Sequence, residues 1–300
     1  KEAYNLKQNL EVKNHLKKVG ILGAGIMGSE IGLCFAAAGC TVALKETELA
    51  LAQKAKARLA GVLDKAVAKG RLNADQREGT LERIIPVEQY DLFSDADLVI
   101  EAVFEKMDLK KKVLAEVDRA CGPDCIIATN TSSIPITLLS TAVEKPRRPL
   151  FIGAHFFAPA FIMKLVEVIP GLETDPHTTE FVLEACRLIG KTPVSVKDTA
   201  GFVVNRLLFA LFNEAVRLVD EGVATCQDID HACRLGLGHP VGPFALMDMA
   251  DLNMALDVGN LLREAYGDRF RFGTALRQKV HAGHLGRKTG HGWYLYPPAK

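Results

Sequence analysis

His155 has the residue type and the setting of a general base. It is one of eight histidines, it ends the apolar run LFIGAH, and Glu167 follows twelve residues later inside the apolar run MKLVEVI. A hairpin-like return of the chain would bring this carboxylate to the imidazole. Such a pair offsets the cost of burying Glu167, and an imidazole is suited to take a proton from an alcohol. The alternative is a core histidine with an unrelated glutamate, and the pattern alone leaves both open.

A glycine-rich turn near the start of the chain has the spacing of a dinucleotide-binding loop. Gly23, Gly25 and Gly28 fall in the sequence GAGIMG, with Ile26 and Met27 before the last glycine. Gly23 permits the tight turn, Gly25 lets the backbone approach a pyrophosphate, and Gly28 lets the following helix pack closely on the strand. The helix N-terminus attracts the phosphate charge, so we expect these five residues to bind a dinucleotide.

An acidic residue at the end of the second apolar run specifies the nucleotide. Glu46 closes TVALKE, eighteen positions after Gly28, where an acid accepts hydrogen bonds from the hydroxyls of the adenosine ribose. Its carboxylate would repel a 2′-phosphate, so we expect NAD rather than NADP. Strand alternation points the neighbouring Lys45 away from Glu46. A βαβ unit that binds no nucleotide is the alternative.

The elements that would position these residues alternate between short apolar runs and longer amphipathic stretches. The runs are KKVGIL, TVALKE, ADLVIEAV and CIIATN, and the helical stretches are 27–38, 49–69 and 109–121. This alternation is typical of a doubly wound parallel sheet, an α/β fold. We therefore predict a Rossmann-type NAD-binding domain over residues 18–198, preceded by an N-terminal extension or linker over residues 1–17.

From about Thr199 the pattern becomes that of helices. The stretch GFVVNRLLFALFNEAVRLVDEG is apolar on nearly all sides and too long for a strand, which predicts a buried helix or a subunit-contact helix. Thr225 followed by Asp228 resembles a capping box at the start of another helix. We predict a smaller, all-helical C-terminal domain over residues 199–300 that binds substrate, with its helix 202–219 forming the contact of a homodimer.

Composition excludes several classes of partner. The 300 residues carry 37 basic and 36 acidic side chains, and a net charge of +1 provides neither a phosphate-binding field for nucleic acid nor a polybasic membrane anchor. No apolar run reaches the roughly 20 residues of a membrane span, and the first residues are not signal-like.

Seven cysteines form no CxxC pair and predict free thiols in a reducing compartment. We expect this compartment to be the cytoplasm, and in a eukaryote the mitochondrial matrix or a peroxisome stays open. The chain begins with Lys1 rather than Met, as a processed, trimmed or excised piece of a longer polypeptide would.

Three further histidines lie close together near the C-terminus. His281, His284 and His291 fall in a glycine-rich tail, and no set of carboxylates or thiolates surrounds them in the sequence. Because a metal centre needs such a set, we expect no metal site there.

Seven motifs along residues 18–296 resemble those of the L-3-hydroxyacyl-CoA dehydrogenase family. In order they are GAGIMGSEI, LVIEAVFEKMDLKKKV, NTSSI, GAHFFAPAFIMKLVEVIP, GFVVNRLL, GHPVGPFALMD and GRKTGHGWYLY. The similarity is greatest to 3-hydroxybutyryl-CoA dehydrogenases and to the dehydrogenase part of multifunctional β-oxidation enzymes. The resemblance implies an oxidoreductase of fatty acid metabolism that interconverts an (S)-3-hydroxyacyl-CoA and the 3-oxoacyl-CoA with NAD(H), and we expect short acyl chains.

The resemblance also implies catalytic roles for individual residues. His155 matches the family's catalytic base, and Glu167 matches the acid that orients it and stabilises its cation. Ser132, in NTSS, and Asn205, in GFVVNR, match residues that hydrogen-bond the C3 oxygen of the substrate and neighbouring groups, and Ser132 is expected at the cofactor as well.

Other matched residues concern binding. Glu105 and Lys110, in FEKMDLK, match positions that contact the nicotinamide half of the cofactor, and Lys288, in GRKTG, matches a further NAD contact. Lys65 and Lys69 fall where the family binds coenzyme A, and their four-residue spacing puts both ammonium groups on one helix face. Without the resemblance these two lysines would be read as a solvated helix face.

One residue departs from the family pattern. Ala158 stands in HFFAP where much of the family has an asparagine that contacts the cofactor. The loss of one hydrogen bond would cost about 1 kcal/mol, or roughly fivefold in affinity, which weakens nicotinamide placement without abolishing activity.

Two other functions stay open beside the 3-hydroxyacyl-CoA dehydrogenase. One is a two-domain NAD-dependent dehydrogenase of a free hydroxy acid or sugar acid, and the other is a non-catalytic NAD-binding protein.

Overall fold

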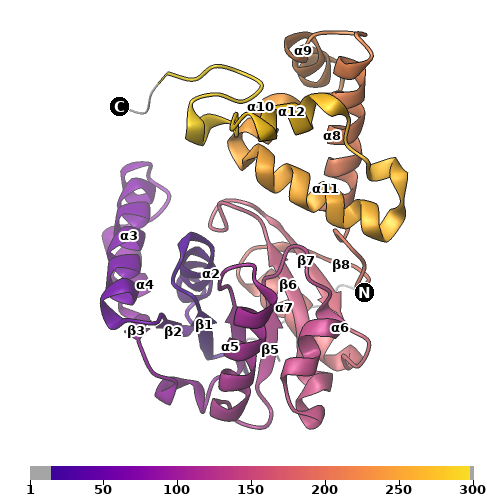
Figure 1. Cartoon of the computed structure of the whole chain (residues 1–300). Helices are drawn as coiled ribbons and strands as arrows, with labels where there is room; N and C mark the ends of the chain where they lie inside the picture. Colours follow the sequence, from indigo (N-terminus) through magenta and orange to yellow (C-terminus); the bar gives the residue numbers. More distant parts are fainter. Residues whose placement is uncertain (1–14, 298–300) are drawn as a thin grey trace, which may run out of the picture. The chain divides into compact units, whose positions relative to one another are not determined.

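The computed structural model describes residues 15–297 of the chain. Along the chain they divide into two units, with the boundary between Thr199 and Ala200. The first unit contains a sheet with its helices, and the second contains helices, as the ribbon in Figure 1 shows.

One sheet forms the centre of the first unit. Within the described residues it has eight strands, in the order β3-β2-β1-β4-β5-β6-β7-β8. Neighbouring strands run parallel, except that β6 and β7 are antiparallel. The strands are β1 (Lys18–Leu22), β2 (Thr41–Lys45), β3 (Ile84–Val87), β4 (Leu98–Glu101), β5 (Ile126–Thr129), β6 (Phe151–Phe156), β7 (Leu165–Pro170) and β8 (Thr192–Ser195). The predicted doubly wound α/β fold is confirmed.

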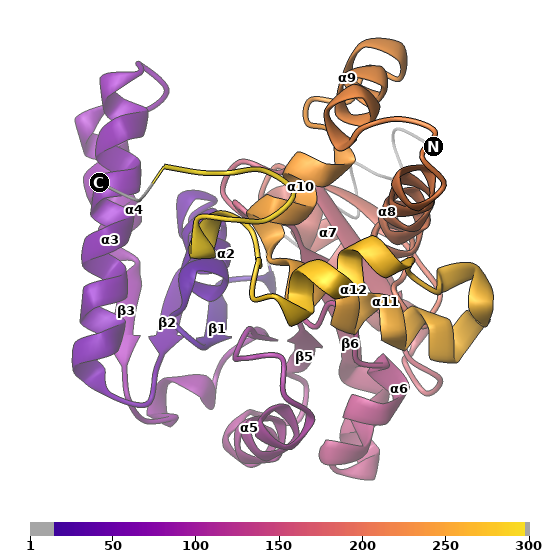
Figure 2. The ribbon, with the colours of Figure 1, turned by 45° about the horizontal axis from the view of Figure 1, so that its top comes forward.

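Helices cover both faces of this sheet, as Figures 1 and 2 show. One face packs on α2 (Ile26–Ala37), α3 (Leu49–Ala68), α4 (Ala74–Glu82) and α7 (Pro176–Leu188), whose apolar side chains share one core with the strands. The other face is covered by α5 (Met107–Ala120) and α6 (Ile136–Leu139). On that face Gly153 of β6 has no side chain because Ile136 fills the space, only 2.6 Å from where a Cβ would lie.

Most elements of the first unit lie within two residues of their predicted bounds. The stretches 27–38, 49–69 and 109–121 correspond to α2, α3 and α5. The apolar pattern did not indicate α4, β3, α6, α7 or β8. In α4 only Thr80 and Leu81 are buried, and the helix starts at a capping box between Asn73 and Gln76 rather than at an apolar stripe. Strand β3 is short, contains Pro86, and has one buried residue.

The second unit is helical. Its helices within the described residues are α8 (Val204–Asp220), α9 (Cys226–Gly236), α10 (Pro243–Ala250), α11 (Leu252–Tyr266) and α12 (Thr274–His281). Their apolar side chains form a separate core that includes Phe212, Phe244, Met247 and Trp293. Helix α9 begins where predicted, because the Asp228 backbone N–H donates to the side chain of its N-cap residue, Thr225.

Helix α8 buries one face rather than all of its surface within its unit. Phe209, Phe212 and Val216 lie in the core, whereas Leu207 is 67% exposed. The predicted helix is therefore present, but within its own unit only one of its faces is buried.

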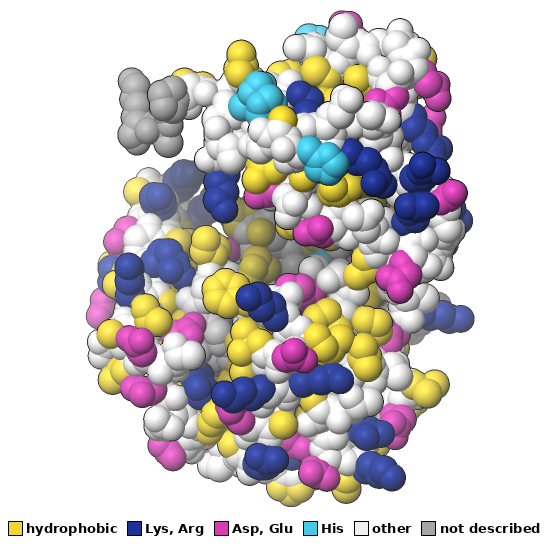
Figure 3. Space-filling model, viewed as in Figure 1, with side chains coloured by type: hydrophobic (Ala, Val, Ile, Leu, Met, Phe, Trp, Pro, Cys, Tyr) yellow, Lys and Arg dark blue, Asp and Glu magenta, His cyan; other side chains and the backbone are white. Residues whose placement is uncertain are grey.

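The surface of the first unit carries both signs of charge. On the face shown in Figure 3, its basic and acidic side chains are interspersed rather than gathered into one patch. Within the part of the chain that the structure describes, no helix has the length and apolar character that crossing a bilayer requires.

Candidate active site

The glycine turn joins β1 to α2 at the carboxyl end of the sheet. Gly23 has a φ of +96°, a conformation that favours glycine. A Cβ on Gly28 would lie 2.0 Å from the carbonyl oxygen of Gly23, so a side chain there would prevent this close packing. Gly25 is the N-cap of α2 and gives the helix no side-chain cap. The first backbone N–H groups of α2, those of Ile26 and Met27 among them, are therefore suited to bind a pyrophosphate.

Glu46 follows β2 and directs its carboxylate to the glycine turn. Its Oε2 accepts a hydrogen bond from the Ala24 backbone N–H at 2.9 Å, and its Oε1 accepts one from the Thr47 backbone N–H at 2.9 Å. Lys45 lies elsewhere, with its Nζ 4.4 Å from the centre of the Tyr90 ring. The carboxylate thus stands beside the turn, where the ribose of a bound dinucleotide is expected.

A guanidinium group that the motifs did not indicate also reaches the glycine turn. Arg58, in α3, donates to the carbonyl oxygens of Ala24 and Gly25 at 3.3 and 3.1 Å, and to Ser29 Oγ at 2.8 Å. It fixes the turn against α3 and places a positive charge beside the N-terminus of α2. No local signal in the sequence links Arg58 to a turn some thirty residues earlier.

Glu105 organises the loop that carries Ser132. Its Oε1 accepts hydrogen bonds from Thr131 Oγ1 at 2.6 Å and from the backbone N–H groups of Ser132 and Ser133 at 3.0 and 3.1 Å. Burial acts to raise the pKa of Glu105, but the charge of Lys110 and these hydrogen bonds outweigh burial and hold the pKa below its ordinary value. The side chain keeps 34% of its surface exposed, so an ionised carboxylate lies at the surface next to Ser132.

Lys110 lies beneath Glu105. Its side chain is 1% exposed, and its Nζ lies 2.7 Å from Glu101 Oε1 and 3.2 Å from Glu105 Oε2. The contact of Lys110 with the nicotinamide half stays a prediction, and in this arrangement it would act through Glu105. The sequence did not indicate a role for Glu101, because one acid at the end of an apolar strand is a weak signal.

Strands β6 and β7 bring His155 and Glu167 together. The two residues are directly opposite in the antiparallel register, and His155 Nδ1 lies 2.8 Å from Glu167 Oε2. Their side chains are 8% and 0% exposed. The predicted hairpin-like pairing is confirmed. Because Glu167 engages Nδ1, it fixes the orientation of the ring and leaves proton exchange with a substrate to Nε2.

The loop that carries Ser132 is tied to the strand that carries His155. Asn130, just after β5, accepts a hydrogen bond on Oδ1 from the Phe156 backbone N–H at 2.8 Å. Because β5 and β6 are neighbouring parallel strands, Ser132 follows the strand next to that of His155. Ala158 comes three residues after His155, and its methyl side chain offers no hydrogen bond.

The remaining predicted residues lie on other elements. Lys65 is exposed near the end of α3, and Lys69, also exposed, is the C-cap residue one turn later. Asn205 is in the first turn of α8, and Lys288 is exposed in the short 3₁₀ turn Arg287–Thr289, so both belong to the second unit. Within the first unit, the structure thus brings four predicted residues to the edge of the sheet at which the glycine turn lies. They end or follow β2, β4, β5 and β6, and they are Glu46, Glu105, Ser132 and His155.

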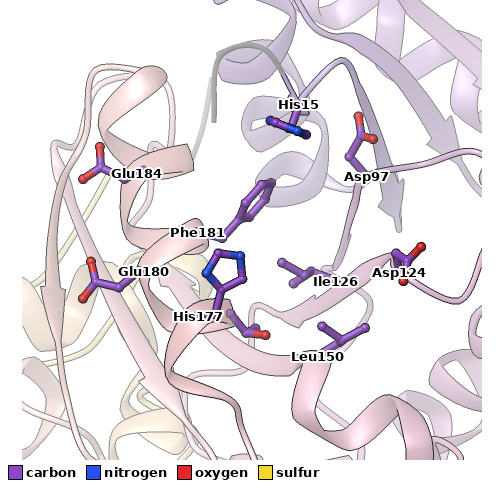
Figure 4. A pocket seen from close by; sticks show the side chains of 10 residues that line it. His15, Asp97, Asp124, Ile126, Leu150, His177, Glu180, Phe181 and Glu184 are labelled. Atoms are coloured by element: carbon purple, nitrogen blue, oxygen red, sulfur yellow. The ribbon is translucent and has the colours of Figure 1, made fainter. Parts of the chain in front are cut away.

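A cavity of about 580 Å³ in the first unit lies elsewhere. Figure 4 shows His177 and Phe181 of α7 across from Ile126, the first residue of β5, with Asp97 before β4. These are the amino ends of the strands, and none of the predicted site residues lines the cavity. Because ligands of doubly wound sheets bind at the carboxyl ends, the chemistry of the side chains locates the site better than cavity volume does.

In the second unit the rings of His284 and His291 stack with their centres 3.7 Å apart. Among residues 15–297, no three His, Cys, Asp or Glu side chains gather as a metal ion would require.

Comparisons with known proteins agree on one family. The 3-hydroxyacyl-CoA dehydrogenase NAD-binding domain matches residues 18–199, and the C-terminal domain of the same family matches residues 201–296. A 3-hydroxybutyryl-CoA dehydrogenase of Clostridioides difficile is 40% identical over 280 residues, which cover 93% of this chain and 99% of that protein. The alpha subunit of the fatty acid oxidation complex of Shewanella frigidimarina is 36% identical over 290 residues, 96% of this chain but 40% of that protein.

A solved structure agrees with these sequences. The crystal structure of (S)-3-hydroxybutyryl-CoA dehydrogenase from Ralstonia eutropha matches with a TM-score of 0.91 and 41% identity, and covers 94% of this chain and 99% of its own. The domain matches include the glycine turn in the first unit and Asn205 in the second. With both domains matched and these relatives covered almost end to end, the chain belongs to the 3-hydroxyacyl-CoA dehydrogenase family.

Proposed function

We propose that this protein interconverts an (S)-3-hydroxyacyl-CoA and the 3-oxoacyl-CoA with NAD(H), and that it acts on short acyl chains such as 3-hydroxybutyryl-CoA. The observation that carries the proposal is the buried pair of His155 and Glu167, 2.8 Å apart, in a unit that matches an NAD-binding domain. The short-chain assignment rests on the relatives named 3-hydroxybutyryl-CoA dehydrogenase.

The residues at the glycine turn fit NAD. The uncapped N-terminus of α2 would bind the pyrophosphate, and Glu46, beside Ala24, would accept hydrogen bonds from the ribose hydroxyls. The chemistry that NAD⁺ would supply there is that of an acceptor for the hydride from the C3 carbon of the substrate. The carboxylate of Glu46 would repel a 2′-phosphate, so a titration should show tighter binding of NADH than of NADPH, and the reverse order would refute this role of Glu46.

His155 moves the proton. In the oxidative direction its Nε2 takes the proton of the substrate hydroxyl, and Glu167, held against Nδ1, stabilises the resulting imidazolium. The hydroxyl of Ser132 can donate a hydrogen bond to the C3 oxygen, and the contact of Asn205, in the second unit, with the substrate stays a prediction. Glu105 supports this step because it fixes the backbone of Ser132 and Ser133.

Lys65 and Lys69 are the proposed site for a phosphate of coenzyme A. Both side chains are exposed, one turn apart at the end of α3, so their ammonium groups can act on one anion. A dehydrogenase of free hydroxy acids would have no use for this pair.

We further propose that the second unit forms a homodimer. Large apolar side chains are exposed on it at Leu207 of α8, at Leu235 of α9 and at Leu237, which are 67%, 85% and 64% exposed. Burial of such side chains against a second copy would remove apolar surface from water. Light scattering after size-exclusion chromatography should give a dimer at micromolar concentration, and a monomer would contradict this proposal.

One assay tests the proposed reaction. Purified protein with acetoacetyl-CoA and NADH should show a loss of absorbance at about 340 nm that depends on both substrates. Turnover should fall as the acyl chain is lengthened. Activity with free hydroxy acids or sugar acids but not with acyl-CoA would replace this proposal with the first alternative, and NADH binding without any turnover would replace it with the second.

A further inference from the structure

A buried ion pair at the end of β4 has no role in the proposed reaction as described. Glu101 is the last residue of β4 and is 0% exposed. Lys110 Nζ donates to both of its carboxylate oxygens, at 2.7 Å to Oε1 and 3.0 Å to Oε2. The Val103 backbone N–H donates to Oε1 at 2.8 Å, and Thr129 Oγ1 donates to Oε2 at 2.6 Å. Glu101 therefore has two donors on each oxygen.

Stability alone does not explain a pair in this place. Two charges removed from water lose their hydration, and apolar residues of similar size often replace such a pair with no loss of stability. The neighbours on β4, from Leu98 to Ile100, are all buried and apolar, and a neutral amide at position 101 would satisfy the Val103 N–H and the Thr129 hydroxyl without any charge. The presence of charges points instead to a group that the pair holds in position.

That group is Glu105. Lys110 Nζ lies 3.2 Å from Glu105 Oε2, while Glu105 Oε1 accepts the backbone N–H groups of Ser132 and Ser133. Glu101, Lys110 and Glu105 thus form a chain of alternating charge from the interior of the sheet to the loop after β5. Two hydrogen bonds to Glu101 hold the Lys110 ammonium group on its buried side, so this group cannot move toward the surface with Glu105.

We infer that Glu101 is a positioning residue that, through Lys110 and Glu105, holds the loop carrying Ser132 in place. Its effect on the order of this loop does not depend on the reaction, whereas its effect on catalysis rests on the proposed function. Glu101 itself is fully buried and touches neither substrate nor cofactor.

The double variant Glu101→Gln with Lys110→Met tests the inference. It removes both buried charges, and the new amide can still bond to the Val103 N–H and to the Thr129 hydroxyl. We expect a melting temperature close to that of the wild type, and hydrogen exchange of the Ser132 and Ser133 amides that is faster by about fivefold or more, as loss of a hydrogen-bond anchor predicts.

A pH series gives a readout that a purely structural role would not change. Without the charge of Lys110, burial should raise the pKa of Glu105, so protection of the Ser132 and Ser133 amides should be lost at a higher pH than in the wild type. Exchange rates are corrected for their intrinsic pH dependence. Glu101→Gln alone keeps the charge of Lys110 and removes a like charge near Glu105, so it should not raise the pKa of Glu105. It should still speed the exchange of the two amides, because Lys110 loses its anchor, and it serves if the double variant does not fold.

Two controls define the outcome. Glu173→Gln breaks the surface pair with Arg148, whose atoms lie 2.9 Å apart, and should leave the exchange of Ser132 and Ser133 unchanged. Glu105→Ala, which removes the acceptor oxygens, should release the two amides even though the buried pair is intact. If the folded Glu101 variants exchange both amides at the wild-type rate, the inference is wrong.

The kinetic readout separates this inference from the proposed function. In an active wild type, the folded variants should raise the KM for NADH or lower kcat by about fivefold, while ADP-ribose, which contacts only the adenosine half, should bind as before. A wild type without acyl-CoA turnover, combined with faster exchange in the variants, would reject the proposed function and leave the positioning role standing.

Discussion

Replacement of Glu167 by glutamine should slow the proposed reaction far more than it weakens cofactor binding. Glu167 Oε2 lies 2.8 Å from His155 Nδ1, and both side chains are buried. With charge centres about 4 Å apart and an effective dielectric constant of about 20, the carboxylate stabilises an imidazolium by about 4 kcal/mol. The glutamine keeps the shape but not the charge, so it removes this stabilisation of the imidazolium. Desolvation offsets part of this, and we expect kcat to fall about 10²- to 10³-fold.

The assay is acetoacetyl-CoA-dependent NADH oxidation at saturating substrate, with the dissociation constant of NADH measured separately by fluorescence. Glu184→Gln is the matched control, because Glu184 is also a buried carboxylate of the first unit, 2% exposed, but it pairs with Arg187 within α7. The control should keep wild-type kcat. A Glu167→Gln variant that binds NADH and retains kcat within threefold of the wild type would refute the role given to this carboxylate.

Three further predictions concern binding and stability. Ala158→Asn should tighten NADH binding by about fivefold, the value of one hydrogen bond, and an unchanged dissociation constant would show that position 158 does not face the cofactor. Lys65→Ala with Lys69→Ala should raise the KM for acetoacetyl-CoA severalfold and leave kcat and NADH binding unchanged; Lys54→Ala, on the same helix, is the control, and an equal effect there would argue for general charge instead of a site. The pKa of Glu105 is lower in the folded protein than its ordinary value of 4.5, so its contribution to stability is complete above that pH and is lost as the pH falls through the lower folded value. Urea denaturation in that acidic range should therefore show a smaller loss of stability for Glu105→Gln than for the wild type, and parallel curves would contradict this.

The pairing of His155 with Glu167 was predictable because strand geometry is regular. The two residues lie in adjacent apolar runs, and a return of the chain between them makes an antiparallel pair in which opposite residues meet. The glycine turn was predictable for a similar reason, since Gly23 and Gly28 are required by a local backbone path. Both signals are contained in short segments.

The positions of Arg58 and Glu101 could not be predicted in this way. Arg58 reaches the glycine turn only because α3 packs beside α2, and the sequence of α3 does not encode that neighbour. Glu101 and Lys110 are nine residues apart on a strand and a helix, and their burial depends on how the covering elements close over them. Side chains that meet through tertiary packing leave no periodic pattern in the sequence.

In the proposed reaction, His155 exchanges the proton with the substrate. The most direct measurement compares acetoacetyl-CoA-dependent NADH oxidation by the wild type and by His155→Gln, with the affinity for NADH determined on the same preparations. We predict that the variant loses most of the turnover while its dissociation constant for NADH stays within about twofold of that of the wild type, because the adenosine half of the cofactor is proposed to bind at the glycine turn. A variant that turns over at the wild-type rate would exclude His155 as the base.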